Sequence, residues 1–297
     1  MRELSREPIV SVIKSNGYYE GSRKALKFFE DDIAVGIKGK NKILIKPNFV
    51  STTVQLAATH VDTIKAVLDI VNEFYDGEII LGEGPSGKSL LEAITNYGYD
   101  SLIDEYRIKT MDLNEDEFIE LEGVDRYLQP LKFRVSKTLL ESDYLISVAR
   151  PKTHDTVIAT LSIKNVVVGS LVSLAEKEKI HQGARAINEN IARLCKHCMP
   201  DLALIDGFVG MEGDGPVDGD PVSLGVSSAS LHPVSLDSVM AKIMGFDPLD
   251  IGYLHYLNDW GVGVADLDRI KVLGEPIDKV YRKFKPHSTY RDQLKWR

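Results

Sequence analysis

Residues 150–169, RPKTHDTVIATLSIKNVVVG, place side chains suited to chemistry within an otherwise apolar run. The polar members of this run include Lys152, His154, Lys164 and Asn165. An isolated buried amine or imidazole is costly unless it is paired. The segment therefore either lies on the surface or lines a cavity that uses these groups.

His154 is a candidate for proton transfer because an imidazole titrates near neutral pH and needs only a modest shift to act as acid or base. Lys152 and His154 lie two residues apart and would face the same way in an extended segment, which favours a functional role. The alternative is a loop histidine that bonds to a backbone carbonyl.

Lys164 lies between apolar neighbours in LSIKNVVVG. Such a lysine either extends its ammonium to solvent or is desolvated and paired. Desolvation lowers the pKa of an amine, which would suit a Schiff base, a general base or an anion clamp. Asn165 beside it offers both a hydrogen-bond donor and an acceptor. We predict a catalytic role for Lys164 and a binding role for Asn165.

His181 lies in the polar stretch EKEKIHQGAR. This stretch could be a lid that closes over a site, or it could equally be an exposed loop. We include His181 with His154 and Lys164 as the predicted catalytic residues.

Four predicted strands end in segments of similar character, namely KPNF at 46–49, GEGPSGK at 82–88, RPKTH at 150–154 and DGFVGMEGDGP at 206–216. Glycine and proline often end strands for steric reasons alone. In open α/β sheets, however, ligands bind beyond the carboxyl ends of the strands. These segments therefore predict one polar site, whose binding residues would be Lys46, Asn48, Gly84, Ser86, Lys152 and Asn165.

The stretch G-E-G-P-S-G-K-S, residues 82–89, has the glycine–lysine–serine spacing of a phosphate loop and follows a predicted strand. Pro85 removes one of the backbone N–H groups that such a loop needs, and Glu83 would place negative charge near bound phosphates. A simple glycine-rich turn is the favoured interpretation, and a nucleotide-binding loop containing Lys88 is the alternative.

Two clusters could hold a metal ion. The first is acidic, and Asp206 and Glu212 are its members nearest a strand end; oxygen-rich loops of this kind can bind Mg²⁺ or Ca²⁺, although a solvated acidic turn is commoner. The second is Cys195, His197 and Cys198, which would need a fourth ligand from elsewhere. Buried helix cysteines are the ordinary alternative.

The elements that must position these residues alternate between strand and helix. Apolar runs predict strands at 8–14, 42–46, 78–84, 144–148 and 203–205, and helical spacing predicts helices at 21–29, 59–75, 89–97, 188–196 and 235–244. Thr59 is the predicted N-cap of the second helix. This order predicts an α/β fold with a mostly parallel sheet covered by helices on both faces. A division of this fold into two lobes is compatible with the same order.

We predict a single domain over residues 1–297. The acidic segment 111–133 is expected to form a surface excursion or a small hairpin. The basic tail at 278–297, which includes YRKFKPHSTYRDQLKWR, is expected to pack weakly or to reach a partner.

The overall composition restricts the class of protein. The net charge of −8 argues against nucleic-acid binding through overall charge. The chain lacks an apolar run long enough to cross a membrane, and the segment MRELSREPIVSVIK predicts no secretory signal. Two cysteines exclude a disulfide scaffold, so we expect a cytoplasmic protein without membrane or nucleic-acid partners.

Taken together, several segments resemble the DUF362 family of prokaryotic proteins. They are KPNFV, THVDTIKAVLDIV, GEGPSG, RPKTHDTVIATLSIKNVVVG, DGFVGMEGDGP and HPVSLDSVMAKIMG, and they extend the resemblance over about 42–274. Most members have no assigned activity, and some are fused to iron–sulfur segments. The four-cysteine runs of such segments do not occur here, so the resemblance implies no cluster within this chain and allows an iron–sulfur partner protein.

A more distant resemblance is to the catalytic domain of the nickel-pincer lactate racemases. That family also places a histidine ten residues before a lysine, followed by another histidine, which would be His154, Lys164 and His181 here. In the family the lysine anchors the pincer cofactor, and the histidines transfer protons or bind the metal. The family's glycine-rich stretch between histidine and lysine is TVIATLS here, so the resemblance is an analogy and transfers no function.

The first hypothesis is an enzyme for a small anionic substrate or cofactor, a carboxylate or a phosphate. Its anion would be neutralised by Lys46, Lys152 and Lys164, while His154 and His181 moved protons. Asp206 and Glu212 would orient the lysines or hold a divalent metal ion. The alternatives are an accessory protein that binds a metal or cofactor beside an iron–sulfur partner, and a nucleotide-dependent transferase that uses GEGPSGKS.

Overall fold

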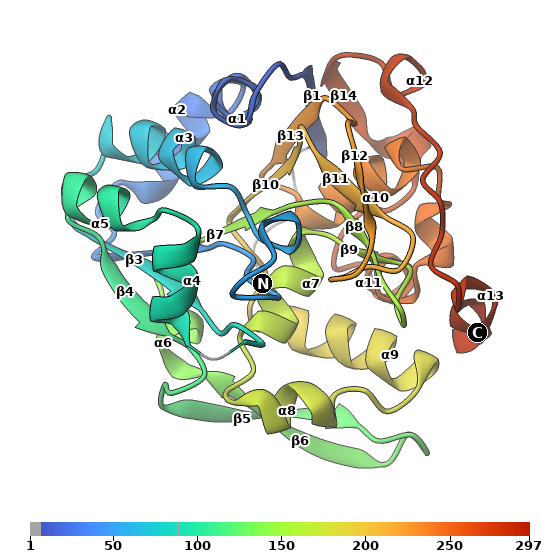
Figure 1. Ribbon diagram of the computed structural model, residues 1–297. Coiled ribbons are helices and arrows are strands. Elements are labelled where there is room, and N and C mark those ends of the chain that lie inside the picture. The colour runs from blue at the N-terminus through green and yellow to red at the C-terminus, as the bar shows by residue number, and fades with distance from the viewer. Residues whose placement is uncertain (1–6, 88) are drawn as a thin grey trace.

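A computed structural model describes residues 7–87 and 89–297. An eight-stranded sheet, in the order β14-β1-β13-β10-β7-β2-β3-β4, forms its centre (Figure 1). The strands of this sheet are β1 (Ile9–Lys14), β2 (Lys42–Lys46), β3 (Glu78–Glu83), β4 (Lys109–Asp112), β7 (Tyr144–Ala149), β10 (Leu202–Gly207), β13 (Val226–Ser230) and β14 (Lys271–Gly274).

The sheet is mixed but mostly parallel. β13 runs antiparallel to both of its neighbours, β1 and β10, and the other neighbouring pairs are parallel. The carboxyl ends of β2, β3, β7 and β10 therefore lie at one edge of the sheet, which we call the carboxyl edge. The predicted convergence of the four strand ends is a direct consequence of this topology.

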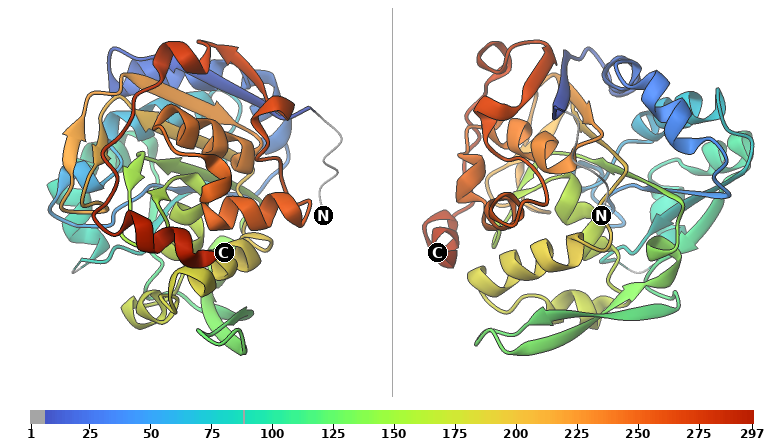
Figure 2. Two further views of the ribbon diagram at one scale, coloured as in Figure 1. Left: turned by 90° about the vertical axis from the view of Figure 1, so that its right-hand side faces the viewer. Right: turned by 180° about the vertical axis from the view of Figure 1, so that it is seen from behind.

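Helices cover both faces of the sheet (Figures 1 and 2). Along β2, Ile43 and Ile45 join one buried apolar cluster while Leu44 joins the other, as expected for a strand buried on both faces. One face is covered by α1 (Tyr18–Lys27), α2 (Glu30–Ile37), α3 (Val61–Asn72), α4 (Leu90–Asn96) and α5 (Asp100–Tyr106). The other is covered by α7 (Ser162–Gly169), α9 (Ala184–Cys195), α10 (Pro233–Ile243) and α11 (Gly252–Asp259). The predicted α/β class is confirmed.

Shorter elements complete the fold. β5 (Phe118–Val124) and β6 (Pro130–Ser136) form a hairpin that packs against α9 at the bottom of Figure 1. A small sheet has the order β12-β11-β8-β9, with β8 (Lys152–Thr153), β9 (Ala159–Thr160), β11 (Gly210–Glu212) and β12 (Asp220–Val222). The remaining helices are α6 (Lys137–Leu140), α8 (Leu174–Lys179), α12 (Ile277–Val280) and α13 (Tyr290–Gln293), with 3₁₀ turns η1 (Gln55–Ala57), η2 (Pro248–Asp250), η3 (Leu267–Arg269) and η4 (Leu294–Trp296).

The start of α3 differs from the prediction. His60, and not Thr59, is the N-cap, because its side chain accepts the N–H of Asp62 at 3.2 Å. Thr59 is buried, and its Oγ1 accepts the N–H of Asn48 and donates to the carbonyl of Val148, both at 2.9 Å. The threonine therefore ties β2 to β7, a tertiary role that the capping pattern did not indicate.

The C-terminal tail packs against the body of the protein. Phe284, Gln293 and Trp296 are buried. The Gln293 side chain donates to the carbonyl of His154 at 2.7 Å and accepts the N–H of Ile158. The tail thereby fixes the turn between β8 and β9, next to the predicted site.

Helices long and apolar enough to cross a lipid bilayer do not occur over residues 7–87 and 89–297.

Candidate active site at the carboxyl edge

Charged and amide side chains are buried at the carboxyl edge of the sheet to an extent that is unusual for a protein core. Each is less than a tenth exposed: Lys46, Asn48, Glu83, Arg150, Lys152, His154, Lys164, Asn165, Lys177 and Asp206. Five of them are Lys or Arg side chains and two are Asp or Glu side chains. This imbalance is the main physical feature of the site, which we call the cationic cluster.

Within the cationic cluster, Lys46 is fully paired. Its Nζ donates to Glu83 Oε2 at 2.6 Å, to the carbonyl of Pro47 at 2.9 Å and to Asn165 Oδ1 at 3.2 Å. Glu83 also accepts the N–H of Phe49 at 3.0 Å. Because the three ammonium protons all have acceptors, Lys46 holds the loop after β2 and has no donor left for a ligand.

Two glycines make this packing possible. A Cβ at Gly169, the last residue of α7, would collide with the Lys46 ammonium, which its three hydrogen bonds hold in place. A Cβ at Gly84 would lie 2.8 Å from Lys177 Nζ and 3.0 Å from the carbonyl of Gly169. The predicted site residue Gly84 therefore lies within the cluster, in a role of close packing.

Lys152 is hydrogen-bonded, but its surroundings disfavour the charged form of its amine. Its Nζ donates to Asn48 Oδ1 and, at 2.6 Å, to the carbonyl of Ala57. Burial lowers the pKa of Lys152 far below the ordinary value, and the charges of Arg150 and Lys164 lower this pKa further. The residue thus contributes to a field that favours an anion.

Lys164 differs from Lys46 and Lys152 in its hydrogen bonding. In the described part of the chain no hydrogen bond or ion pair reaches its ammonium, although the side chain is only 6% exposed. Burial lowers the pKa of Lys164 to about 8, and the charge of Asp155 opposes this effect. A buried ammonium with free donors is a strong site for an oxyanion.

His154 lies beside Lys164. Burial lowers the pKa of His154 to about 3, with Lys164 as the next cause, so the imidazole is neutral at physiological pH. Its Nδ1 lies 2.9 Å from Asp155 Oδ1 and 3.1 Å from the N–H of Thr156. In a neutral ring, Nδ1 either donates a hydrogen bond to Asp155 or accepts one from the N–H of Thr156. In the tautomer that donates to Asp155, Nε2 is the basic nitrogen.

His181 lies at the rim of the site, where it is exposed. Burial by the surrounding protein and the charge of Lys164 nevertheless lower the pKa of His181. Its Nδ1 lies 2.7 Å from the carbonyl of Lys177. Because a carbonyl only accepts, Nδ1 carries the proton and Nε2 is the basic nitrogen. The three predicted catalytic residues, from three separate segments, therefore influence one another electrostatically.

Helix α7 presents Lys164 to the site. Asp237 of α10 binds the start of this helix: it accepts the N–H of Ser162 at 2.9 Å, the N–H of Ile163 at 3.0 Å and the Ser162 hydroxyl. Burial raises the pKa of Asp237 to about 7 despite these donors. Asn165, one position after Lys164, donates to Ser147 and to the carbonyl of Lys46, which fixes the helix on the sheet.

The predicted metal ligands Asp206 and Glu212 each hydrogen-bond to other groups. Asp206 accepts hydrogen bonds from Thr63 at 2.6 Å and from the N–H of Phe208 at 3.0 Å. Glu212 lies on β11 and accepts the N–H of Lys285 at 2.8 Å. Residues 7–87 and 89–297 contain no group of three or more His, Cys, Asp or Glu side chains that could hold a metal ion.

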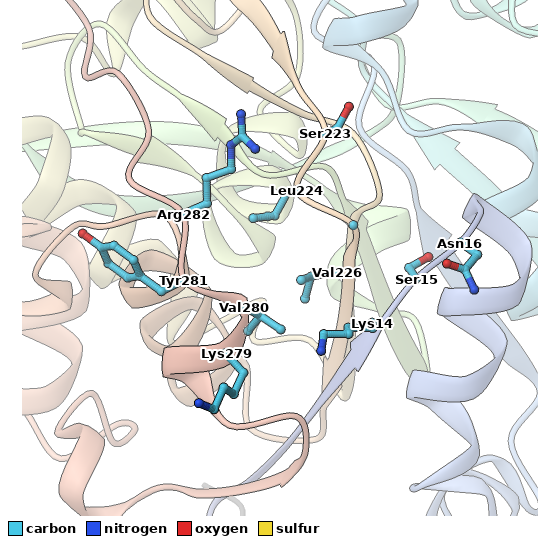
Figure 3. Close-up of a pocket in the computed structure, with 11 residues that line it drawn as sticks. Lys14, Ser15, Asn16, Ser223, Leu224, Val226, Lys279, Val280, Tyr281 and Arg282 are labelled. Carbon is cyan, nitrogen blue, oxygen red and sulfur yellow. The ribbon is translucent and has the colours of Figure 1, made fainter.

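The glycine-rich stretch 82–89 lies partly outside the described residues, because Lys88 is one of those left out. Ser86 lines a surface cleft of about 450 Å³ together with Ser51, Thr52, Glu92 and Val217. This cleft lies over the loops that follow β2 and β3. A second cleft, of about 420 Å³, lies between Lys14, Val226 and the segment at Lys279; its Arg282 and Tyr281 side chains point away from Lys14 (Figure 3).

Three residues of the cationic cluster are not among the predicted site residues. The sequence pattern indicates Glu83 only as an obstacle to phosphate binding, and it indicates no role for Arg150. Lys177 donates to Asn114 Oδ1 and approaches Gly84, and burial lowers the pKa of Lys177 to about 8. Its sequence context, LAEKEKI, is typical of an exposed helix, so no local signal indicates that it is buried.

Replacing Lys164 with methionine is expected to raise the pKa of both His154 and His181. A nearby positive charge disfavours the imidazolium, so its removal favours protonation. Burial remains, so both values should stay below 6.5, the ordinary value for histidine. NMR titration of the histidine rings measures this shift, and Lys132→Met on the exposed hairpin is the control. Unchanged titration in Lys164→Met would contradict the arrangement described.

Comparisons with known proteins found similar chains. The chain is 27% identical over 251 residues to the thylakoid-associated protein sll1697 of Synechocystis sp., covering 82% of this chain and 76% of that protein. Among solved structures, the lactate racemase apoprotein from Thermoanaerobacterium thermosaccharolyticum superposes with a TM-score of 0.48 at 18% identity. That match covers 69% of this chain and about half, 51%, of the racemase chain, and a similarity at this level carries no information about chemistry.

The family model described as a domain of unknown function, DUF362, matches residues 43–242. This range includes the whole cationic cluster and every predicted site residue. It is somewhat shorter than the predicted 42–274. Because the match spans more than half of the 297 residues, the chain belongs to the DUF362 family.

Proposed function

We propose that this protein is an enzyme that acts on a small anionic substrate or cofactor, with a carboxylate or phosphate group held by the Lys164 ammonium. The observation that carries this proposal is the burial of Lys164 without an acceptor, next to two neutral histidines. A buried ammonium is expensive unless an anion compensates it. The ligand would supply that anion.

The residues divide into distinct roles in this proposal. Lys164 binds the oxyanion, and Lys152 adds positive charge while it holds Asn48. His154 and His181 accept or return protons through Nε2, and Asp155 orients His154. Lys46, which Glu83 neutralises, shapes the site and does not contact the ligand. Preorganised charges in a site with little water are an effective means of stabilising charge that develops during a reaction.

Two alternatives have less support. Cys195 and Cys198 are both buried free thiols, and burial raises the pKa of Cys198 to about 12, so neither is a ready metal ligand for a carrier protein. Glu83 in the glycine-rich stretch is bonded to Lys46 and lies where a phosphate loop would need neutral backbone. We also propose that the protein is cytoplasmic, which cell fractionation tests, and that it has an iron–sulfur partner protein, which affinity purification tests.

Lys164→Met is expected to weaken the binding of acetate and phosphate by about 10- to 100-fold, because a hydrogen bond to a charged group contributes about 1.5–3 kcal/mol. The measurement is calorimetric titration at constant ionic strength. Lys132→Met removes an exposed lysine and should bind like the wild type. Wild-type affinity in Lys164→Met would refute the proposal.

The same measurement across pH tests the ionisation of Lys164. Its pKa of about 8 means that the ammonium is charged below that pH and neutral above it. The affinity for an anion should therefore be constant from about pH 6.5 to 8 and then fall by up to about tenfold per pH unit. Lys164→Met should lack this alkaline decrease, whereas Lys132→Met should retain it.

A further inference from the structure

Arg150, the residue after β7, is buried, and three of its five side-chain N–H donors are unused among the described residues. Its Nη1 donates to the carbonyls of Gln55 at 3.0 Å and Leu56 at 3.3 Å in η1. Its Nε and Nη2 are fully covered and make no hydrogen bond of normal geometry with the described residues. Nε and Nη2 form one edge of the guanidinium, and this edge matches the two oxygens of a carboxylate or phosphate.

Among the described residues, no carboxylate forms a hydrogen bond with Nε or Nη2. Asp206 is close enough for its charge to interact with that of Arg150. Its oxygens, however, already accept hydrogen bonds from Thr63, Phe208 and Ser227. Burial raises the pKa of Asp206, which weakens it further as a counter-ion. The side-chain nitrogen of Gln55 is a further buried donor without a partner in the described part of the chain. Unsatisfied buried donors cost about 1–3 kcal/mol each, so their presence points to a missing acceptor.

Two helices begin beside Arg150. Tyr18 is the first residue of α1, and its ring centroid lies 5.4 Å from the Arg150 guanidinium carbon. His60, the N-cap of α3, stacks on Tyr18 with 3.8 Å between the ring centroids. The N-terminal ends of helices carry partial positive charge. An anion at Arg150 would therefore lie in a favourable field.

We infer that the Nε–Nη2 edge of Arg150 binds a second oxyanion, so that the ligand of this site carries two anionic groups, one at Lys164 and one at Arg150. The Lys164 half of this inference rests on the proposed function. A small dicarboxylate, or a carboxylate that also carries a phosphate, has the required chemistry.

The two positions are separate but connected. Asp155 and His154 experience the charge of Lys164, whereas Tyr18 and Asp206 experience that of Arg150. Lys152 lies between them and experiences both. Arg150 and His154 are four residues apart, so their Cα atoms are at most about 14 Å from each other. A compact ligand could span this distance.

The Tyr18 ring covers Arg150, so a ligand must displace it to reach the Nε–Nη2 edge. Tyr18 is half-buried; its ring contacts those of His60 and Phe208, and its hydroxyl interacts with the Arg150 guanidinium. Rotation of such a side chain requires no change in the backbone.

The experiment compares acetate with the dicarboxylates from malonate to adipate by calorimetric titration at constant ionic strength. Wild-type protein should bind the best dicarboxylate at least about tenfold more tightly than acetate, as one additional charged hydrogen bond implies. Arg150→Lys keeps the charge but loses the two-pronged geometry. It should lose this preference while its affinity for acetate stays within about twofold of wild type. Arg193→Lys, at a partly buried ion pair with Glu189 on α9, is the matched control.

The outcomes separate the two proposals. If Arg150→Lys retains the preference for dicarboxylates, or if wild-type protein shows none, the second oxyanion position is refuted. In either case the proposed function stands as long as acetate binding depends on Lys164. If neither acetate nor any dicarboxylate nor phosphate binds to the wild type, both proposals fail. A merely structural role for Arg150 would weaken acetate and dicarboxylates alike and would also refute the inference.

Discussion

Glu83→Gln is expected to lower the free energy of unfolding by about 3–5 kcal/mol, because it leaves the Lys46 ammonium buried without a counter-ion. The pair is buried on both sides, with 0% and 2% of the side chains exposed. Glu83 also accepts the N–H groups of Phe49 and Gly84, so its carboxylate organises the ends of two neighbouring strands. Denaturant unfolding monitored by circular dichroism measures the effect.

The loss of unfolding free energy in Glu83→Gln should become smaller as the pH rises. Burial already lowers the pKa of Lys46 from 10.5, and Glu83 opposes this effect, so the variant lowers it further. A lysine with a lower pKa in the folded state binds fewer protons there, so stability rises as pH increases toward 10.5. The deficit of the variant should therefore be smaller at about pH 9 than at about pH 7.

A second substitution isolates the interaction. Lys46→Met in the Glu83→Gln background removes the unpaired charge, so the double variant should be more stable than Glu83→Gln alone. Glu120→Gln, at an exposed pair with Lys132, should cost less than about 1 kcal/mol. The interpretation fails if Glu83→Gln costs as little as this control and shows no coupling to Lys46→Met.

Asp237→Ala is expected to lower the free energy of unfolding by about 3–5 kcal/mol, since three buried donors at the start of α7 lose their acceptor and each costs about 1–3 kcal/mol. These donors are the N–H groups of Ser162 and Ile163 and the Ser162 hydroxyl. Because α7 carries Lys164, the loss should extend to anion binding. Asp237 would then be a positioning residue.

Two milder variants calibrate this effect. Asp237→Asn keeps one acceptor oxygen and should recover part of the stability. Ser162→Ala removes the hydroxyl alone and should cost about 1 kcal/mol. Titration with acetate distinguishes positioning from simple destabilisation: at a temperature where Asp237→Ala is fully folded, its affinity should still be reduced. Wild-type affinity under those conditions would show that Asp237 stabilises the fold without positioning Lys164.

The sequence by itself determined the class of fold and the edge of the sheet at which the polar residues gather. Short apolar runs such as 42–46 and 144–148 alternate with helical patterns, and these local patterns suffice to predict parallel strands. Once the strands are parallel, their carboxyl ends must share an edge. Lys46 and Lys152, which follow two of these strands, are therefore expected at the same edge. The cap of α3 lies one residue later than predicted because threonine is a preferred N-cap type and histidine is not.

Only the tertiary structure decided which cations are neutralised. Lys46 meets Glu83 and Asn165 across 37 and 119 residues of sequence, and Lys177 reaches the cluster from α8. Such pairing depends on how side chains of distant segments pack, and one sequence carries no periodic signal for it. Lys164 and Arg150 keep unused donors for the same reason: no carboxylate of the described residues 7–87 and 89–297 forms an ion pair with either side chain. Local chemistry thus supplied the candidate residues, and long-range packing selected those left to bind a ligand.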